Sequence, residues 1–199
     1  MPIWVGGLLT HGRLSTQRSR TSTNEAAGTE RRCDTEEWQS MTNAVQNIWR
    51  HADATPENVA LRADGRTWTY DELRAGIARA AVELERRGVG RGDRVLLVVP
   101  TVAEFVFVYH GVLSLGATAV TVNTLCTAPE IEYFLTDADC KLAVGYRDVA
   151  DALLVAATAV TRPTWILDPG SIGPGAVGAA GERPSYVDVD EHDAAVLLY

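Results

Sequence analysis

Lysine is almost missing from this sequence of 199 residues, because Lys141 stands alone and every other basic residue is arginine. Chemistry that needs a lysine amine therefore has a single candidate. Lys141 opens a run of strand-like residues, and a solvent-exposed side chain at the start of a strand is the simpler interpretation. We assign it no catalytic role.

Cysteine and histidine are also scarce, and neither shows the spacing of a metal site. The three cysteines are odd in number and far apart, which argues against a disulfide framework, and we interpret them as reduced thiols of a cytoplasmic protein. The pair His192-Asp193 is typical of a turn rather than of a catalytic dyad. The residues concerned are Cys33, Cys126 and Cys140, with His11, His51, His110 and His192.

Positive charge is in deficit, with a formal net charge of -8. Such a chain offers no basic face that could release counterions from a phosphate backbone, so nucleic acid is excluded as a partner. Four of its acids gather near the carboxyl end without the spacing of a calcium loop, and we expect a solvated acidic loop there. They are Asp188, Asp190, Glu191 and Asp193.

Charged residues are absent from residues 105–122, a run long enough to suggest a membrane span. Two glycines interrupt it, and Gly116 stands where a helix would end before the β-branched stretch 120–122. We therefore predict a buried helix that leads directly into a buried strand, and no membrane span.

The first 40 residues differ from the rest, since no apolar period is sustained and Ser, Thr, Arg and Gly dominate. We expect residues 1–40 to be a disordered extension, with Met41 as an alternative start of the protein. A secretory signal is disfavoured because no basic stretch precedes the short apolar run, and a transit peptide is only weakly supported. Residues 41–199 form the predicted folded domain.

From residue 41 onward helical and strand patterns alternate. This order predicts an α/β fold with a partial doubly wound, mainly parallel sheet and flanking helices. The run 94–99 is apolar throughout, as in a strand covered on both faces. The expected elements are helices around 45–52, 73–84 and 148–157, a hairpin of 59–63 with 67–70, and strands at 94–99, 141–144, 164–167 and 194–199.

Three helix starts carry a Thr followed three residues later by a Glu, the pattern of a capping box. In such a box the Thr oxygen accepts a hydrogen bond from the first turn, and the Glu reaches back to the cap residue; each cap contributes about 1 kcal/mol. The three pairs are Thr69 with Glu72, Thr101 with Glu104, and Thr127 with Glu130.

Two glycine clusters superficially resemble nucleotide-binding loops. The first, residues 88–92, follows a helix and precedes a strand, which is the wrong order for a dinucleotide loop and indicates a tight turn. The second, residues 170–175, follows a strand, but no lysine and no periodic helix come after it. We interpret it as a mobile surface loop.

Five local patterns, in order, resemble the adenylate-forming (AMP-binding) superfamily of acyl-CoA synthetases, luciferases and peptide-synthetase adenylation domains. The resemblance covers about residues 45–199 and is carried by Trp68–Leu73, Gly88–Val95, Pro100–Phe105, Gly111–Val120 and Asp193–Tyr199. The last of these resembles the strand that leads into the family's Ser/Thr/Gly-rich phosphate loop. By this comparison the sequence stops before that loop.

Asn123 is similar to the acyl-CoA synthetase branch rather than to the peptide-synthetase branch, in which an Asp is usual. Two departures bear on the acyl substrate: Thr121 stands where the family commonly has Pro, and residues 124–127 are not a typical loop. The resemblance implies the amino-terminal part of a fatty-acid–CoA ligase, with chain length left open.

In that family a carboxylate and ATP form an acyl-adenylate, and CoA then takes the acyl group. The resemblance implies ATP, Mg²⁺ and CoA for the complete enzyme, bound by groups that follow residue 199. We therefore assign no catalytic, cofactor-binding or metal residue, expect the chain alone to be inactive and without a cofactor, and consider a complementary downstream chain as its partner. A non-catalytic binding or scaffold module and an unrelated flavodoxin-like cofactor domain remain alternatives.

Overall fold

The computed structural model describes residues 43–63, 65–173 and 186–199. All of them belong to one compact unit, residues 35–199. The predicted disordered extension, the alternative start at Met41, Cys33 and His11 lie outside the described residues.

The centre of this unit is a parallel sheet of five strands in the order β6-β5-β3-β4-β7. Every neighbouring pair runs parallel, including the last strand beside β4. This confirms the predicted α/β fold with a mainly parallel sheet. The strands are β3 (Arg94–Val98), β4 (Thr118–Thr121), β5 (Leu142–Tyr146), β6 (Thr164–Leu167) and β7 (Val196–Leu198).

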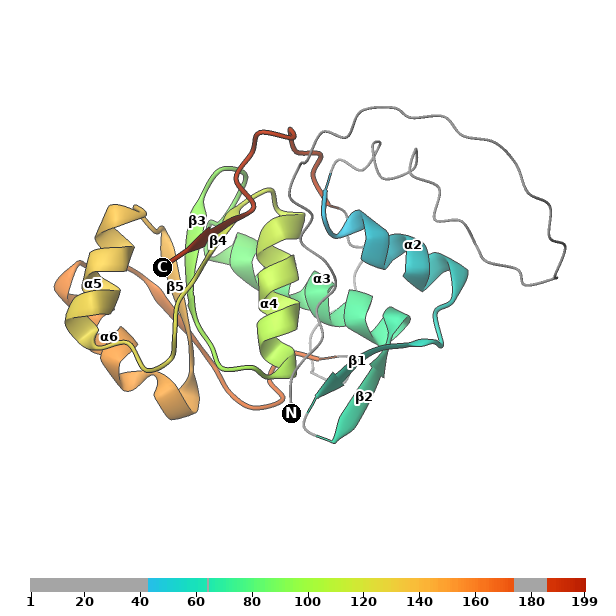
Figure 1. The fold of residues 1–199 in the computed structure, drawn as a ribbon, viewed down its shortest axis with the longest axis horizontal. Coiled ribbons are helices and arrows are strands. Elements are labelled where there is room, and N and C mark those ends of the chain that lie inside the picture. The colour runs from blue at the N-terminus through green and yellow to red at the C-terminus, as the bar shows by residue number, and fades with distance from the viewer. Residues whose placement is uncertain (1–42, 64, 174–185) are drawn as a thin grey trace, which may run out of the picture. The chain divides into compact units, whose positions relative to one another are not determined.

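Helices cover both faces of this sheet, as Figure 1 shows. Alternate residues of β3 point to opposite faces: Val95 and Leu97 belong to the core with α3 and α4, and Leu96 and Val98 to the core with α5 and α6. Burial on both sides explains the uninterrupted apolar run in the sequence. The helices are α3 (Tyr70–Arg86), α4 (Ala103–Ser114), α5 (Ala128–Asp137) and α6 (Asp151–Ala159), with a short η1 (Arg147–Val149) before α6.

A helix and a hairpin precede the sheet and pack on the α3 side. The hairpin is antiparallel, as predicted, and Gly65 provides the positive φ of 74° that its turn requires. Trp68 in its second strand lies edge-on to Phe107 of α4, with the two ring centroids 6.3 Å apart. The elements are α2 (Gln46–Ala54), β1 (Val59–Ala63) and β2 (Arg66–Thr69).

The charge-free run 105–122 is a buried helix followed by a strand, as predicted. Helix α4 ends at Ser114, Gly116 takes a φ of 67°, and β4 begins at Thr118. Among the residues that the structure describes, none of the helices combines the length and apolar character needed to cross a membrane.

Helices α3 and α4 approach each other closely because glycine stands at the contact. A Cβ on Gly76 would lie 2.6 Å from the Phe107 ring, and one on Gly111 would lie 2.9 Å from Ala80 Cβ and 3.1 Å from Ala81 N. The second approach involves backbone, which cannot move aside without shifting the helix. Small residues therefore set the spacing of this helix pair.

The glycine cluster 88–92 is the predicted turn between α3 and β3. Gly88 and Gly92 both have φ near 80°, and Gly88 N donates to Glu85 O as the helix ends. Asp93 closes the turn by accepting from Gly90 N at 2.8 Å and pairing with Lys141 Nζ at 2.8 Å. The single lysine thus links the start of β5 to the turn before β3, at the amino ends of the strands.

Two of the three predicted capping boxes are present. Thr69 and Glu72 exchange both hydrogen bonds at the start of α3, and Glu130 accepts from Thr127 N at 2.7 Å at the start of α5. The third prediction is wrong. Helix α4 begins at Ala103 after an extended Val102, and the Glu104 carboxylate is bound elsewhere.

The beginning and end of the described chain meet at a buried asparagine. Asn43, 4% exposed, donates from Nδ2 to Leu113 O at 2.8 Å and to Val187 O at 2.9 Å, and its Oδ1 accepts from Val45 N at 3.1 Å. Val187 N also donates to Ser114 O. This joint attaches the start of α2 and the segment before β7 to the end of α4.

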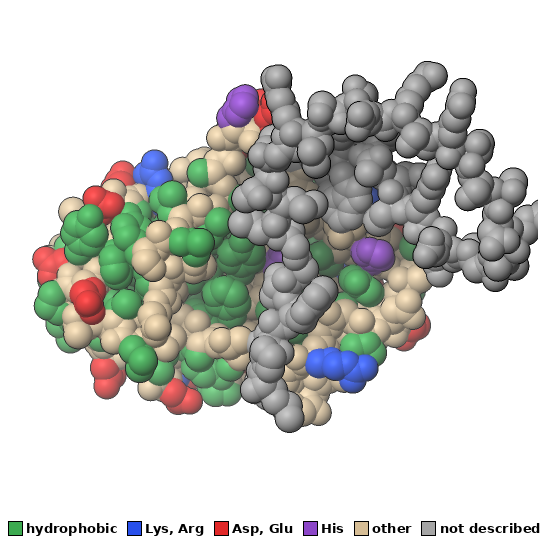
Figure 2. Space-filling view, viewed as in Figure 1, with side chains coloured by type: hydrophobic (Ala, Val, Ile, Leu, Met, Phe, Trp, Pro, Cys, Tyr) green, Lys and Arg blue, Asp and Glu red, His purple; other side chains and the backbone are tan. Residues whose placement is uncertain are grey.

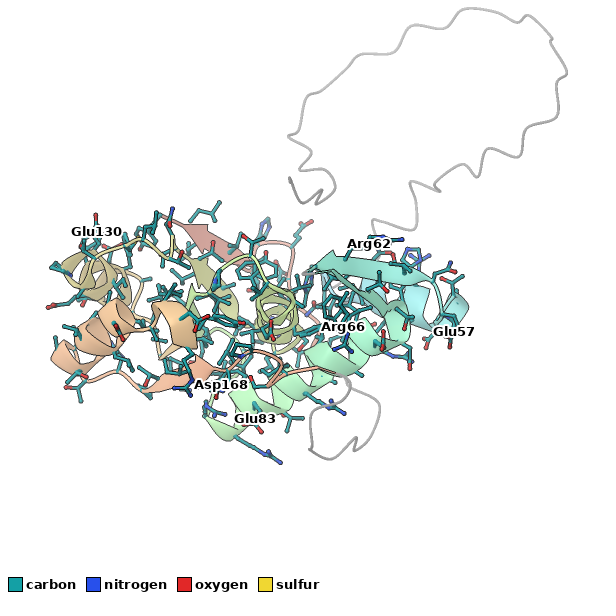
Figure 3. All side chains as sticks on the ribbon, turned by 90° about the horizontal axis from the view of Figure 1, so that it is seen from below. Glu57, Arg62, Arg66, Glu83, Glu130 and Asp168 are labelled. Atoms are coloured by element: carbon teal, nitrogen blue, oxygen red, sulfur yellow. The ribbon has the colours of Figure 1, made fainter. Side chains whose placement is uncertain are left out.

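Charged side chains are spread over the outside. In Figure 3, Arg62 and Arg66 lie on the hairpin and Glu130 lies at the start of α5, at opposite ends of the described part. The acidic residues near the carboxyl end form the expected exposed turn, in which Asp193 pairs with Arg91 at 2.9 Å.

The last strand, β7, forms where a strand was expected and is poorly covered. Leu197 packs with α5 and α6, whereas Leu198 is 76% exposed and Val196 lies at the surface. Figure 2 shows hydrophobic side chains reaching the surface among acidic ones on the α5 side of the molecule.

Candidate functional site

The connections of the sheet define one place where a ligand could enter between its covering helices. Strand β3 continues into α4 on one face, whereas its neighbour β4 continues into α5 on the other face. Open α/β sheets bind ligands at such a point, beyond the carboxyl ends of the strands. The carboxyl edge at β3 and β4 is therefore the candidate site.

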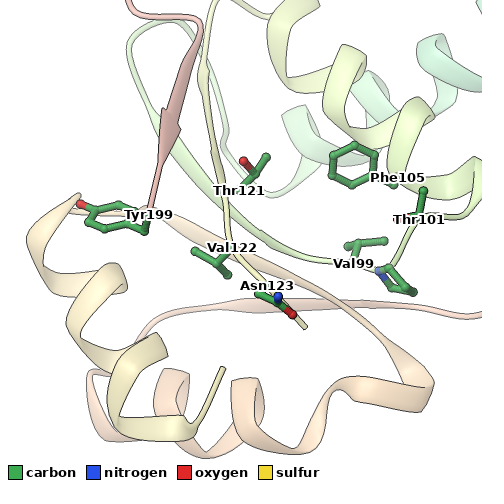
Figure 4. Close-up of a pocket in the computed structure, with 8 residues that line it drawn as sticks. Val99, Thr101, Phe105, Thr121, Val122, Asn123 and Tyr199 are labelled. Atoms are coloured by element: carbon green, nitrogen blue, oxygen red, sulfur yellow. The ribbon is translucent and has the colours of Figure 1, made fainter. Parts of the chain in front are cut away.

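A pocket of about 250 Å³ lies at this edge (Figure 4). Three groups of residues line it: those that follow β3, those that end or follow β4, and the residue after β7. Because each group comes directly after a strand, the parallel sheet itself brings them together. They are Val99, Pro100, Thr101 and Phe105, then Thr121, Val122 and Asn123, and finally Tyr199.

The polar groups of the pocket are uncharged. Thr101 and Thr121 contribute hydroxyls, and Asn123 contributes a side-chain amide. Asn123 Oδ1 accepts from Leu125 N at 2.9 Å, so its Nδ2 is the group that remains to donate to a ligand. Leu125, in the same loop, is 86% exposed.

Tyr199 forms one side of the pocket and is held by α5. Its hydroxyl donates to Asp137 Oδ2 at 2.5 Å, and its ring lies 4.6 Å from the ring of Phe134. The hydrogen bond to the Asp137 carboxylate raises the pKa of Tyr199 to about 12, because it stabilises the protonated phenol. The ring is therefore fixed beside α5 at the end of β7.

The lining does not fit the phosphates of ATP on its own. None of its eight residues is Lys, Arg or His, so a triphosphate would find no opposing charge there. Within the described ranges, no cluster of three His, Cys, Asp or Glu side chains could hold a metal ion. We therefore derive no chemical step from these residues.

The residues weighed in the sequence lie away from this pocket. Lys141 is at the amino edge of the sheet in its ion pair with Asp93. His192 lies in the exposed acidic turn, 3.7 Å from Glu191. His110 is half-buried in α4, where desolvation lowers its pKa and its Nδ1 lies 2.9 Å from Val106 O.

The cysteines that the structure describes, Cys126 and Cys140, are both free thiols. Cys140 is buried under α5, and its burial raises the thiol pKa to about 12. A thiol in this state is neither a nucleophile nor a metal ligand at neutral pH. Three pocket residues were named in the sequence for other reasons: Thr101 for a capping box, and Thr121 and Asn123 for the family resemblance. The pocket that brings them together was not predicted.

Comparison with known proteins gives a family match over most of the chain. The family model described as "AMP-binding enzyme" matches residues 48–199. The long-chain-fatty-acid–CoA ligase FadD13 of Mycobacterium tuberculosis is 38% identical over 76 residues, which are 38% of this chain and 15% of that protein. The 3-hydroxybenzoate–CoA/4-hydroxybenzoate–CoA ligase of Thauera aromatica is 37% identical over 105 residues, 52% of this chain and 20% of that protein.

The fold is shared with solved structures of larger proteins. MatB from Rhodopseudomonas palustris superposes with a TM-score of 0.67 at 28% identity, covering 79% of this chain and 32% of the MatB chain. The chain thus spans 15% of the length of FadD13 and 32% of the MatB chain.

Proposed function

Because the chain belongs to the AMP-binding enzyme family, we propose that it is the amino-terminal part of an ATP-dependent acyl-CoA synthetase. The observation that carries this proposal is that the family match includes every strand of the parallel sheet. The pocket at the carboxyl edge of the strands β3 and β4 therefore lies within the matched residues. Family membership also replaces the flavodoxin-like cofactor domain as the explanation of that sheet.

We propose a fatty acid as the substrate of the complete enzyme. FadD13, at 38% identity, supports this choice, and the apolar part of the pocket lining is compatible with it. The Thauera relative matches a longer part of the chain and makes a hydroxybenzoate the direct rival. ATP, Mg²⁺ and CoA would be the cosubstrates and cofactor, and the cytoplasm the proposed location.

Catalysis by this proposal needs charged groups that the described pocket lining does not supply. Stabilising the charge that develops during adenylate formation requires preorganised hydrogen-bond donors or cations. The pocket lining contains no Lys, Arg or His and so offers no cation. We therefore propose that the chain is inactive alone and acts with a complementary segment such as the one that follows in its relatives. The exposed face of β7 is a surface on which such a segment could pack.

The test is carboxylate-dependent exchange of pyrophosphate into ATP. The chain is assayed alone and after co-expression with the remaining segment of FadD13, with dodecanoate or 4-hydroxybenzoate as the acid. We expect no exchange by either part alone, and exchange by the pair that is faster with dodecanoate. The FadD13 segment alone is the matched control.

Each other outcome has a clear meaning. Exchange by the chain alone would refute its inactivity, and faster exchange with 4-hydroxybenzoate would replace the fatty acid by an aromatic acid. A pair that co-purifies but exchanges with neither acid would favour the second hypothesis, a non-catalytic binding or scaffold module.

A further inference from the structure

The buried carboxylate of Glu104 has a partner far away in the sequence. Glu104 lies in the first turn of α4 with 8% of its surface exposed, and its Oε1 accepts a hydrogen bond from Gly170 N at 2.6 Å. Gly170 stands 66 residues later, in the loop after β6. A short, charge-assisted bond of this kind is stronger than a neutral one, and a buried carboxylate without it would be costly.

The loop whose Gly170 N donates this bond is well anchored. Ser171 N donates to Asp168 O, and Gly170 has a φ of 72°, which together with Pro169 makes the type II turn that a glycine favours. Ile172 is buried in the core beside α3 and α4, contrary to the expected surface loop. The Arg79 guanidinium on α3 also donates to Gly173 O. Residues 174–175 of the predicted glycine loop lie outside the described residues.

Two sequence patterns that fail as separate motifs thus meet in space. The Glu of the incorrect capping box binds the first glycine of the cluster that resembled a phosphate loop. The meeting point is close in the chain to the pocket lining, because Phe105 follows Glu104 and Thr101 precedes α4, and both line the pocket.

We propose that Glu104 is a positioning residue, which clamps the loop of residues 168–173 to the first turn of α4 and thereby fixes Thr101 and Phe105 in the pocket. The clamp lies outside the pocket and touches no ligand. The proposal concerns the shape of the pocket in this chain. It does not depend on which carboxylic acid the complete enzyme activates.

The first experiment measures amide hydrogen exchange in the full chain. Glu104→Ala removes the acceptor, and we expect exchange to accelerate about tenfold or more at Gly170 N and also at Phe105 N, which donates to Val102 O. Glu104→Gln keeps an acceptor oxygen at the same place and should restore most of the protection at both amides. Glu132→Ala, an exposed acid on α5, is the matched control and should change neither.

A glycine pair keeps the proposal testable if Glu104→Ala fails to fold. A Cβ would meet no atom within 4 Å at either Gly170 or Gly173, but only Gly170 has a positive φ. Gly170→Ala should therefore disturb the turn and accelerate exchange at Phe105, whereas Gly173→Ala should not. The proposal is overturned if Phe105 stays protected when the loop is disturbed, or if Gly170 N stays protected in Glu104→Ala.

Discussion

Replacing Asn43 by alanine should destabilise the folded unit more than any change at an exposed asparagine. The substitution removes the amide that donates to Leu113 O and Val187 O and the oxygen that accepts from Val45 N. Leu113 O keeps a partner, since Gly116 N also donates to it. Val187 O and Val45 N lose the bonds that Asn43 supplies.

The magnitude follows from these two backbone groups. Val45 is fully buried and its unsatisfied N–H costs about 1–3 kcal/mol, whereas Val187 O is only partly buried and costs less, so we expect Asn43→Ala to lower the free energy of unfolding by about 2–4 kcal/mol. For a domain of this size that corresponds to a fall in Tm of roughly 5–15 °C. The cost is concentrated in the joint, because the side chain contributes little apolar area to the core.

Urea denaturation followed by circular dichroism measures this loss. The m-value reports whether the surface area exposed on unfolding is the same in the variant and the original protein. Asn123→Ala is the matched control: it removes one exposed side-chain bond to Leu125 N and should cost less than about 1 kcal/mol. A loss below about 1 kcal/mol for Asn43→Ala would refute the reasoning, because it would show that water or relaxation satisfies the groups that the asparagine binds.

Four further outcomes are expected. Gly111→Ala should destabilise by about 1–3 kcal/mol in urea denaturation, because its Cβ would meet helix backbone; an unchanged midpoint would mean that α3 and α4 can separate freely. Cys140 should resist iodoacetamide at pH 8 in the native chain and react after unfolding, as read by mass spectrometry, since burial raises its pKa. The phenol of Tyr199 should titrate near pH 12 in ultraviolet difference spectra and near its ordinary value in Asp137→Asn; its raised folded pKa adds stability that is present below pH 10 and lost as the pH rises toward 12. Deleting residues 1–40 should leave Tm within about 4 °C of the full chain, because a segment without an apolar period contributes little burial; a larger drop would show that it packs.

Local composition was enough to predict most elements of this fold. The apolar run 94–98 and the stripe on α3 follow from burial on one or both faces, and alternation of helices and strands led to the parallel sheet. The capping boxes at Thr69 and Thr127 are local in the same sense, because each partner lies three residues away.

Predictions failed where a distant segment competes for a side chain. Glu104 has the spacing of a capping residue, yet Gly170 holds its carboxylate, and nothing within the local sequence records that contact. The pocket was missed for a related reason: Thr101, Asn123 and Tyr199 become neighbours only once β3, β4 and β7 are parallel. The site thus depends on strand order, which single positions do not encode.

The joint between Asn43 and Val187 also has a consequence for the order of folding. Strands β3, β4 and β5 are linked by single helices, so their pairing closes short loops and can occur early. The joint connects residues 144 positions apart, and forming it costs the entropy of closing nearly the whole described chain. During synthesis, the bond from Asn43 Nδ2 to Val187 O can form only after the ribosome has released residue 187. Helix α2 can pack on α3 and reach Leu113 O before then, whereas the contact between Asn43 and the segment before β7 should form among the last steps of folding.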